Sequence, residues 1–231
     1  MFSKTADWYD LVYSFKDYAK ESRTVIDLLR SLHPNARTVL DVACGTGEHD
    51  HHLGNQYDVD GIDINESFVA IARKKNPGRN YVCADMIDFS LDRKYDVILC
   101  LFSSIGYAKT IENVAKALMC FKRHLNTDGV IVVEPWLVPE VWNVGQISVH
   151  TAERDNCHIV RMGFCGREGS ISSFTCYYLI GTPDGIRYEV ERHELGLFSR
   201  EEMLRAFELA GLAVQYSEPG FCGRGLYVAR G

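Results

Sequence analysis

The chain has 231 residues, of which 46% are hydrophobic, enough for the core of one large α/β domain or of a domain with an insertion. Its formal net charge is −6 at pH 7. This charge argues against a general nucleic-acid-binding protein, because neutralising a phosphate backbone needs a basic surface, but it leaves room for one anionic small molecule held by a few arginines.

The eight cysteines include no C-x-x-C pair, and Cys83 and Cys100 lie in apolar, strand-like runs. They are typical of reduced core residues rather than of a disulfide framework or a zinc site. Residues 1–7 lack the apolar core of a signal peptide, and no apolar run is long enough to span a membrane. We therefore expect a cytoplasmic protein without a membrane partner.

The first segment with a distinctive composition is the aromatic stretch of residues 7–18. Such rings usually pack against the body of a domain, but they also suit a lid that excludes water from a bound ligand. A helix follows, with apolar residues at i, i+3, i+4 and i+7 from Val25, and Pro34 ends it.

Residues 38–53 predict a strand, a glycine turn and the start of a helix. Residues 38–40 are apolar and β-rich, Gly45 and Gly47 follow Asp41, and residues 48–53 can begin a helix. Glycines accept positive φ and carry no Cβ, so the backbone can approach a ligand that the first N–H groups of the helix also face. This is the opening of a nucleotide-binding β-α-β unit.

The acidic residue before the glycines helps to identify the nucleotide. A dinucleotide-binding turn needs a third glycine at position 50, where this chain has Asp50, and this argues against a nicotinamide dehydrogenase. Asp41 stands four residues before Gly45, and a carboxylate there suits a ligand with a cationic end better than a pyrophosphate. The pattern resembles the first motif of the class I S-adenosylmethionine-dependent methyltransferases, although a purely structural turn is the alternative.

From residue 38 to residue 134, strands and helices alternate regularly. This rhythm predicts an α/β fold with a doubly wound, mostly parallel sheet, whose ligands bind beyond the carboxyl ends of the strands. The expected strands cover residues 38–43, 58–64, 81–84, 95–102 and 130–134, and the expected helices cover 48–55, 66–75 and a segment from about residue 110.

At Pro135 the pattern changes to strands separated by short turns, such as the turn at residues 183–185. Short turns predict an antiparallel sheet, inserted after the fifth strand. Ser199 and Glu202 form a capping box that opens a last helix, which Gly211 ends. The inserted strands are expected at residues 145–154, 157–167, 171–181 and 186–197, and two final strands, at 212–217 and 225–229, complete a seven-stranded sheet.

Further candidate ligand-binding residues fall at the expected strand ends. Asp63 ends the second strand, 16 residues beyond Gly47, where a carboxylate typically accepts hydrogen bonds from ribose hydroxyls; the alternative is a solvated carboxylate. Asp85 and Met86 follow the third strand and could bracket an adenine, with the carboxylate at the exocyclic amine and the thioether on the ring. Because Asp63, Asp85 and Met86 follow successive strands, as Asp41 and the glycines do, the whole set predicts S-adenosyl-L-methionine as the cofactor.

Four blocks, at residues 41–47, 102–107, 132–136 and 223–226, narrow the resemblance. With the segments 6–13 and 121–125, they make nearly the whole chain similar to the N,N-dimethyltransferases of antibiotic biosynthesis, which methylate the amino group of thymidine-diphosphate (TDP)-linked deoxyamino sugars. The resemblance implies an S-adenosylmethionine-dependent N-methyltransferase that forms a homodimer and has a small-molecule acceptor.

The same resemblance implies a division of the chain. Residues 1–136 and 198–231 would form the cofactor-binding Rossmann-like domain, with an N-terminal lid of about residues 1–20. Residues 137–197 would form an inserted antiparallel subdomain for substrate binding and dimerisation.

The functional residues are also implied by the resemblance. Tyr13 and His124 would approach the acceptor amine, as a base or as positioning groups, and Arg224 would meet the diphosphate. The alternatives are packing alone for Tyr13 and a helix C-terminal histidine favoured by the helix dipole for His124. The implied substrate side also contains Tyr9, Ser103 and Trp136, and the implied cofactor site contains Tyr18, Asp41, Ala43, Gly45, Thr46, Gly47, Asp63, Ile64, Asp85, Met86, Leu101 and Phe102.

Several departures from the family leave the acceptor open. The connection after Tyr13 is short, Leu137 replaces an aromatic residue after Trp136, and residues 218–222 replace a more polar turn. The acceptor could be an amine, hydroxyl or carboxylate of another metabolite, or the chain could be a non-catalytic cofactor-binding module. The histidines of residues 49–52 invite a metal site, but the spacing offers no third ligand, so we expect a hydrated helix face and no metal.

Overall fold

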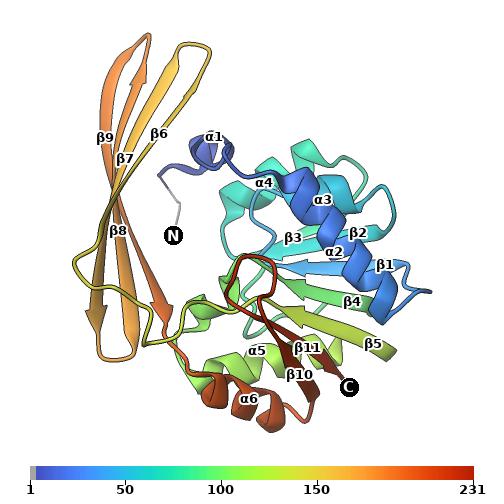
Figure 1. Cartoon of the computed structure of the whole chain (residues 1–231). Helices are drawn as coiled ribbons and strands as arrows, with labels where there is room; N and C mark the ends of the chain where they lie inside the picture. Colours follow the sequence, from blue (N-terminus) through green and yellow to red (C-terminus); the bar gives the residue numbers. More distant parts are fainter. Residues whose placement is uncertain (1–3) are drawn as a thin grey trace.

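The main sheet of the computed structural model, which describes residues 4–231, has seven strands in the order β3-β2-β1-β4-β5-β11-β10 (Figure 1). Neighbouring strands from β1 to β5 are parallel, whereas β11 runs antiparallel to both β5 and β10. The predicted doubly wound sheet is therefore confirmed. Its strands are β1 (Thr38–Val42), β2 (Asp58–Asp63), β3 (Tyr81–Cys83), β4 (Tyr95–Cys100), β5 (Leu125–Val133), β10 (Ala213–Ser217) and β11 (Leu226–Arg230).

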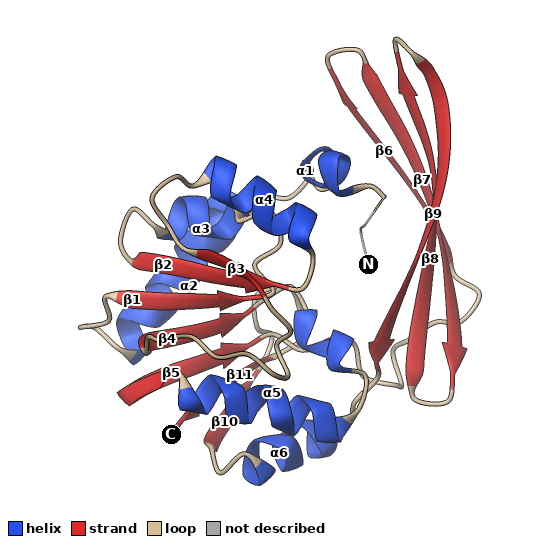
Figure 2. Cartoon of the chain, turned by 180° about the vertical axis from the view of Figure 1, so that it is seen from behind, coloured by secondary structure: helices blue, strands red, loops and turns tan. Residues whose placement is uncertain are grey.

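Helices cover both faces of this sheet (Figure 2). Successive strand residues point to opposite faces, so Val39 packs with the α2 side and Leu40 with the α5 and α6 side. Both are fully buried, as a parallel sheet between two helical layers requires. The helices are η1 (Ala6–Trp8), α1 (Tyr9–Val12), α2 (Tyr18–Leu32), α3 (Glu48–Leu53), α4 (Glu66–Lys75), η2 (Ser104–Ala108), α5 (Ile111–Arg123) and α6 (Arg200–Leu209).

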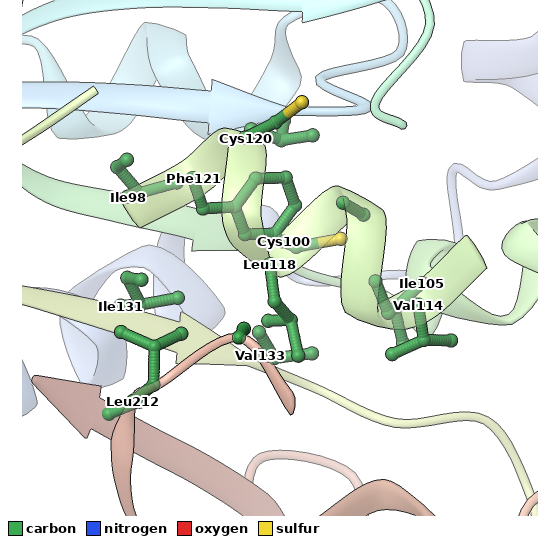
Figure 3. Packing of buried hydrophobic residues seen from close by; sticks show 14 of the residues in the cluster. Ile98, Cys100, Ile105, Val114, Leu118, Cys120, Phe121, Ile131, Val133 and Leu212 are labelled. Carbon is green, nitrogen blue, oxygen red and sulfur yellow. The ribbon is translucent and has the colours of Figure 1, made fainter. Parts of the chain in front are cut away.

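The larger core lies where α5 meets β4 and β5 (Figure 3). Leu118 and Phe121 from α5 are fully buried against Ile98 and Ile131 of the two central strands. Because β4 and β5 are held by this contact along their length, their carboxyl ends have fixed positions, and these ends form one wall of the cavity described below.

The second sheet consists of four antiparallel strands in sequence order and follows β5 in the chain. One of its faces packs on helix α1, where Leu11 and Val12 contact Ile159 and Tyr178. Figures 1 and 2 show this sheet standing beside the main domain, with α1 between them. The strands are β6 (Ile147–Arg154), β7 (Cys157–Glu168), β8 (Ile171–Thr182) and β9 (Gly185–Gly196).

Most element boundaries lie within two residues of the prediction, and the capping box of Ser199 and Glu202 is confirmed. The fifth strand is the exception, because it begins at Leu125 rather than at residue 130. Asp128, with φ of 63°, lies inside β5, where the pairing with β4 is irregular. The expected turn is thus a local interruption of the strand. No helix within residues 4–231 is long and apolar enough to cross a membrane.

Asp96 ties together the starts of β1, β4 and β5. Its carboxylate accepts hydrogen bonds from the backbone N–H of Arg37 at 2.8 Å, from the backbone N–H and hydroxyl of Thr38 at 3.0 Å each, and from the Asn126 side chain at 2.8 Å. Burial pushes its pKa upward, but these hydrogen bonds outweigh burial and lower the pKa to about 2.

We expect Asp96→Asn to lower the free energy of unfolding at pH 7 by about 1 kcal/mol, because a charge-assisted cluster is weakened. The carboxyl has a pKa of about 3.9 in the unfolded chain. The difference in free energy of unfolding between the variant and wild type should therefore have its full size above that pKa, and it should shrink as the pH falls through 4 towards 2. Urea unfolding at several pH values measures it, with the exposed Asp92→Asn as control. A pH-independent difference would contradict this role.

Candidate active site

A cavity of about 510 Å³ lies at the carboxyl ends of the parallel strands. Its lining comes from the segments after the parallel strands, from η2 and the start of α5, from α1 and the residue after it, and from β8 and β9 of the second sheet. Asp63, Tyr107, Tyr13 and His193 represent these parts. A smaller adjoining cavity of about 50 Å³ shares some of these walls and adds Asp41 and Thr46. The site thus lies where an open α/β sheet binds its ligands.

The two glycines of the first turn have different roles. Gly45 has φ of 57°, lines both cavities, and a Cβ built on it would meet no atom within 4 Å. Its backbone is therefore open to a ligand. Gly47, with φ of 70°, lies below the turn, and a Cβ there would come within 2.7 Å of Asn76 Nδ2. Gly47, a predicted cofactor-binding residue, does not line either cavity, and its missing Cβ makes room for the end of α4.

Asp63 connects the turn after β1 to the turn after β2. Its carboxylate accepts the N–H of Gly45 at 2.9 Å and the N–H of Asn65 at 2.8 Å. Burial raises its pKa, and both hydrogen bonds oppose this shift. Asp85 and Met86 line the same cavity after β3, and Asp85 accepts the N–H of Ile87 at 3.1 Å. The strand ends thus present carboxylates along one rim of the cavity.

Phe102 and Ser103, which follow β4, have left-handed backbone angles, with φ of 50° and 64°. Such angles are uncommon for residues other than glycine and need support from the surroundings. The buried Glu134 supplies it, because its carboxylate accepts the N–H of Phe102 and the thiol of Cys222 at 2.7 Å each. Burial and the neighbouring Glu134 raise the pKa of Cys222 to about 12, so the thiol keeps its proton and donates it.

Ser103, a predicted substrate-binding residue, does not line either cavity. It is buried, and its hydroxyl donates to the carbonyl of Pro135 at 2.7 Å and accepts from Nη1 of Arg224 at 2.6 Å. The guanidinium of Arg224 also lies over the ring of Trp136, 4.9 Å from its centroid. Ser103 and Trp136 therefore hold Arg224 at the cavity wall, which Lys109 also lines. Arg224 precedes β11, and β5, β4 and β1 separate β11 from β2, which ends at Asp63.

The lid contributes aromatic rings. Tyr13 lies 4.6 Å from Tyr9 and 5.7 Å from Phe102, between ring centroids, and the guanidinium of Arg161 lies 5.1 Å from the Tyr13 ring. Burial raises the pKa of Tyr13, and the nearby Arg161 only partly opposes this shift. Tyr13 is therefore a phenol at neutral pH, suited to hydrogen bonding rather than to acting as a strong base.

Tyr107 and His193 form a hydrogen-bonded pair on the wall of the cavity, with 3.0 Å between the Tyr107 hydroxyl and Nδ1 of His193. Tyr107 comes from η2 and His193 from β9. Burial lowers the pKa of His193 to about 4, and the nearby Arg161 acts in the same direction. The imidazole is therefore neutral at pH 7, and the pair presents no positive charge to the cavity.

His124 is not part of this site, which corrects the prediction. It caps the C-terminus of α5, about 20 Å along the helix from the end that lines the cavity. Both ring nitrogens are engaged with backbone, Nδ1 with the carbonyl of Cys120 at 2.8 Å and Nε2 with the N–H of Leu91 at 2.9 Å. Its ring stacks on Phe89 at 4.5 Å. The structure therefore favours the alternative of a helix C-terminal histidine.

The other predicted residues line one or both cavities. Among residues that were not predicted, Tyr107 belongs to the block at 102–107 and could have been found there, whereas His193 lies in an alternating strand that gives no sequence signal. The predicted residues that line the cavities are Tyr9, Tyr13, Tyr18, Asp41, Ala43, Gly45, Thr46, Asp63, Ile64, Asp85, Met86, Leu101, Phe102, Trp136 and Arg224.

The histidines of α3 do not assemble a metal centre. His49 Nε2 contacts the carboxylate of Glu21 at 3.0 Å, and its ring lies 4.9 Å from that of Tyr18. In the described part of the chain, no group of three or more histidine, cysteine, aspartate or glutamate residues could hold a metal ion.

Comparisons with known proteins agree with this geometry. A general methyltransferase-domain family matches residues 39–129. The dTDP-3-amino-3,4,6-trideoxy-alpha-D-glucopyranose N,N-dimethyltransferase of Streptomyces venezuelae is 40% identical over 227 residues, which cover 96% of each chain. The crystal structure of Streptomyces venezuelae DesVI superposes with a TM-score of 0.92 at 40% identity over 97% of both chains. The structure of S-adenosylmethionine-bound CalS10, an amino pentose methyltransferase from Micromonospora, superposes with a TM-score of 0.83 at 32% identity. The match covers 93% of this chain and 91% of CalS10.

We expect His124→Ala to lower the free energy of unfolding by about 2 kcal/mol, because it leaves the N–H of Leu91 unpaired and removes the stacked ring. Ligand binding in the cavity should stay unchanged, because His124 is at the far end of α5. Urea unfolding and calorimetric ligand titration measure the two effects. Weaker ligand binding without a loss of stability would contradict this structural role and would indicate that His124 acts in the site.

Proposed function

This chain belongs to the family of S-adenosylmethionine-dependent sugar N,N-dimethyltransferases, and we propose that it methylates the amine of a TDP-linked 3-amino deoxy sugar, in two successive transfers. The observation that supports this acceptor best is the two-sided cavity. Its carboxylate rim suits a cationic nucleoside, and the anchored Arg224 faces it from the other side. The chain is thus an S-adenosylmethionine-dependent N-methyltransferase, and the sugar is the part that we propose.

The residues at the strand ends fit S-adenosylmethionine. Gly45 leaves its backbone open, and Asp63 keeps lone pairs for ribose hydroxyls beyond the two N–H groups that it accepts. Asp85 and Met86 would bracket the adenine, and Asp41 in the smaller cavity would face the amino-acid end. Ala43, Ile64, Leu101, Phe102, Tyr18 and Thr46 would complete this side.

When bound, this cofactor supplies an activated methyl group on its sulfonium. The chain then has to hold an unprotonated amine in line with that group, and positioning of this kind can contribute about 7–11 kcal/mol. We assign Tyr13, the Tyr107–His193 pair and Tyr9 to the amine and the sugar, because they line the cavity and remain uncharged at pH 7. A neutral wall does not hold the acceptor as a protonated ammonium, which has no nucleophilic lone pair.

Arg224 is the proposed partner of the diphosphate. Ser103 occupies one of its N–H groups and Trp136 supports one face of the guanidinium, so its remaining donors can meet two phosphate oxygens. The aromatic side chains of Trp136 and Phe174, which line the same cavity, would cover the rest of the acceptor. In this proposal the residues from 137 to 197 serve as the substrate subdomain.

We also propose a homodimer formed through the outer face of the second sheet. Val149, Met162 and Tyr177 lie opposite one another on β6, β7 and β8, and their exposed fractions are 61%, 47% and 42%. The next row of the same face contains Val160, Leu179 and Tyr188, also exposed. A continuous apolar face of this kind is typical of an interaction surface.

All eight cysteines are free thiols, which suits a reducing cytoplasm, the proposed location.

Calorimetric titration of S-adenosylhomocysteine, followed by TDP, tests the function. We expect both to bind wild type, and Arg224→Ala to weaken only TDP, by about 10- to 100-fold, because a charge-assisted contact is lost. Arg200→Ala, on the exposed end of α6, is the matched control. Turnover with a TDP-linked 3-amino sugar then identifies the acceptor. Binding of the cofactor product without TDP would contradict the proposed sugar.

The dimer can be tested separately with Met162→Glu, which places a charge at the centre of the apolar row. We expect wild type to sediment as a dimer and the variant as a monomer, because a buried unpaired carboxylate opposes association. Glu208→Gln, which changes an exposed residue of α6 outside the second sheet, is the control. A wild-type monomer at micromolar concentration would contradict the proposal.

A further inference from the structure

Asp50 is a buried carboxyl beneath the glycine turn. Its exposed fraction is 0%, and neither carboxylate oxygen accepts a hydrogen bond of ordinary length from the described residues. Asp41, at 3% exposed, lies beside it, and the two side chains are within hydrogen-bonding reach of each other. The buried hydroxyl of Tyr81 makes no hydrogen bond of ordinary length in the described chain, but it lies close enough to Asp50 to oppose part of the rise in the pKa of that carboxyl. A carboxyl–carboxyl contact without a donor needs a proton to become a hydrogen bond.

Two carboxylates buried side by side are not both ionised unless a positive charge lies close to them, because each loses its hydration and repels the other. Burial raises the pKa of both Asp41 and Asp50, and the charge of Asp50 raises that of Asp41 further. The groups that face the pair include both signs of charge. They are Tyr81 from β3, Cys44 from the turn after β1, Asp63 from β2, His49 on α3, and Arg79, whose guanidinium donates to the backbone carbonyl of Asp50.

We propose that Asp41 and Asp50 share one proton and that the arrival of the cationic cofactor expels this proton to solvent, so that cofactor binding is coupled to proton release. The inference rests on the proposed placement of the amino-acid end of the cofactor beside Asp41, and it is independent of the acceptor. The balance is simple: the O–H bond of the shared proton breaks, the buffer takes the proton, and the pair changes from one negative charge to two.

The charge of the cofactor explains why its binding releases a proton rather than taking one up. Asp41 lines the smaller cavity, whereas Asp50 is behind it and touches no ligand space. S-adenosylmethionine carries one net positive charge, and its demethylated product carries none. A positive charge near Asp41 stabilises the doubly ionised pair, so the cofactor gains affinity as the pH rises and its product gains less. The pair would thereby favour exchange of the spent product for fresh cofactor.

Isothermal titration of S-adenosylmethionine in buffers of different ionisation enthalpy counts the protons released. We expect wild type to release a fraction of a proton between pH 6 and 8, to release less with S-adenosylhomocysteine, and to gain up to about tenfold in affinity per pH unit. Asp50→Leu, which removes the second carboxyl, should abolish the release and flatten the affinity profile. Asp60→Asn is the matched control, because Asp60 is equally buried but is paired with Arg93 and Tyr95.

Equal proton release by wild type and Asp50→Leu would overturn the inference while leaving the cofactor site intact. Failure of wild type to bind S-adenosylmethionine would overturn the proposed function as well, so the two failures are distinguishable.

Asp50→Asn is the second variant, because asparagine cannot hold the proton yet is close in size. In the unliganded protein, the infrared band of a protonated carboxyl should be present in wild type and absent from Asp50→Asn; its absence from wild type would also overturn the inference.

Discussion

The architecture of the site depends on carboxylates that close the turn of a neighbouring strand. Asp63, which ends β2, accepts the N–H of Gly45 after β1, and Glu134, which follows β5, accepts the N–H of Phe102 after β4. Each of these turns contains left-handed residues whose backbone groups would otherwise be unpaired at a buried sheet edge. The hydrogen bonds fix the turns before any ligand is present, so the cavity between them is largely preformed.

The fold could be predicted from the sequence because periodicity and turn residues carry most of the information about it. The regular succession of strands and helices up to β5, and the short turns between the strands from β6 to β9, predicted a parallel sheet and a separate antiparallel one. The start of β5 was missed because Asp128 and Gly129 have the composition of a turn, whereas pairing with β4 keeps this segment in the sheet. Nothing in the sequence indicated which face of the second sheet is covered, because that depends on its packing against α1.

The site could be predicted only where its residues follow strands of the main sheet. Residues such as Asp63 and Asp85 were found because the carboxyl ends of parallel strands share one edge. His124 was assigned from its residue type and from the resemblance, and the structure shows it satisfied by the backbone of its own helix end. His193 was missed because nothing in a strand sequence says that one of its side chains faces a cavity in another part of the chain.

The lid is the element that joins the two parts of the chain around the cavity. On the domain side, Asp10 accepts the hydroxyl of Thr46 at 2.5 Å and pairs with Lys75 at 2.7 Å. On the other side, the carboxylate of Glu191 accepts the hydroxyl of Thr5 at 2.6 Å. Thr46 lines the smaller cavity, so the contact that holds the lid down is also a wall of the proposed cofactor site. A ligand seated on that wall would therefore contact the residue that holds α1 against the main domain, so the smaller cavity and the position of α1 depend on the same hydrogen bond.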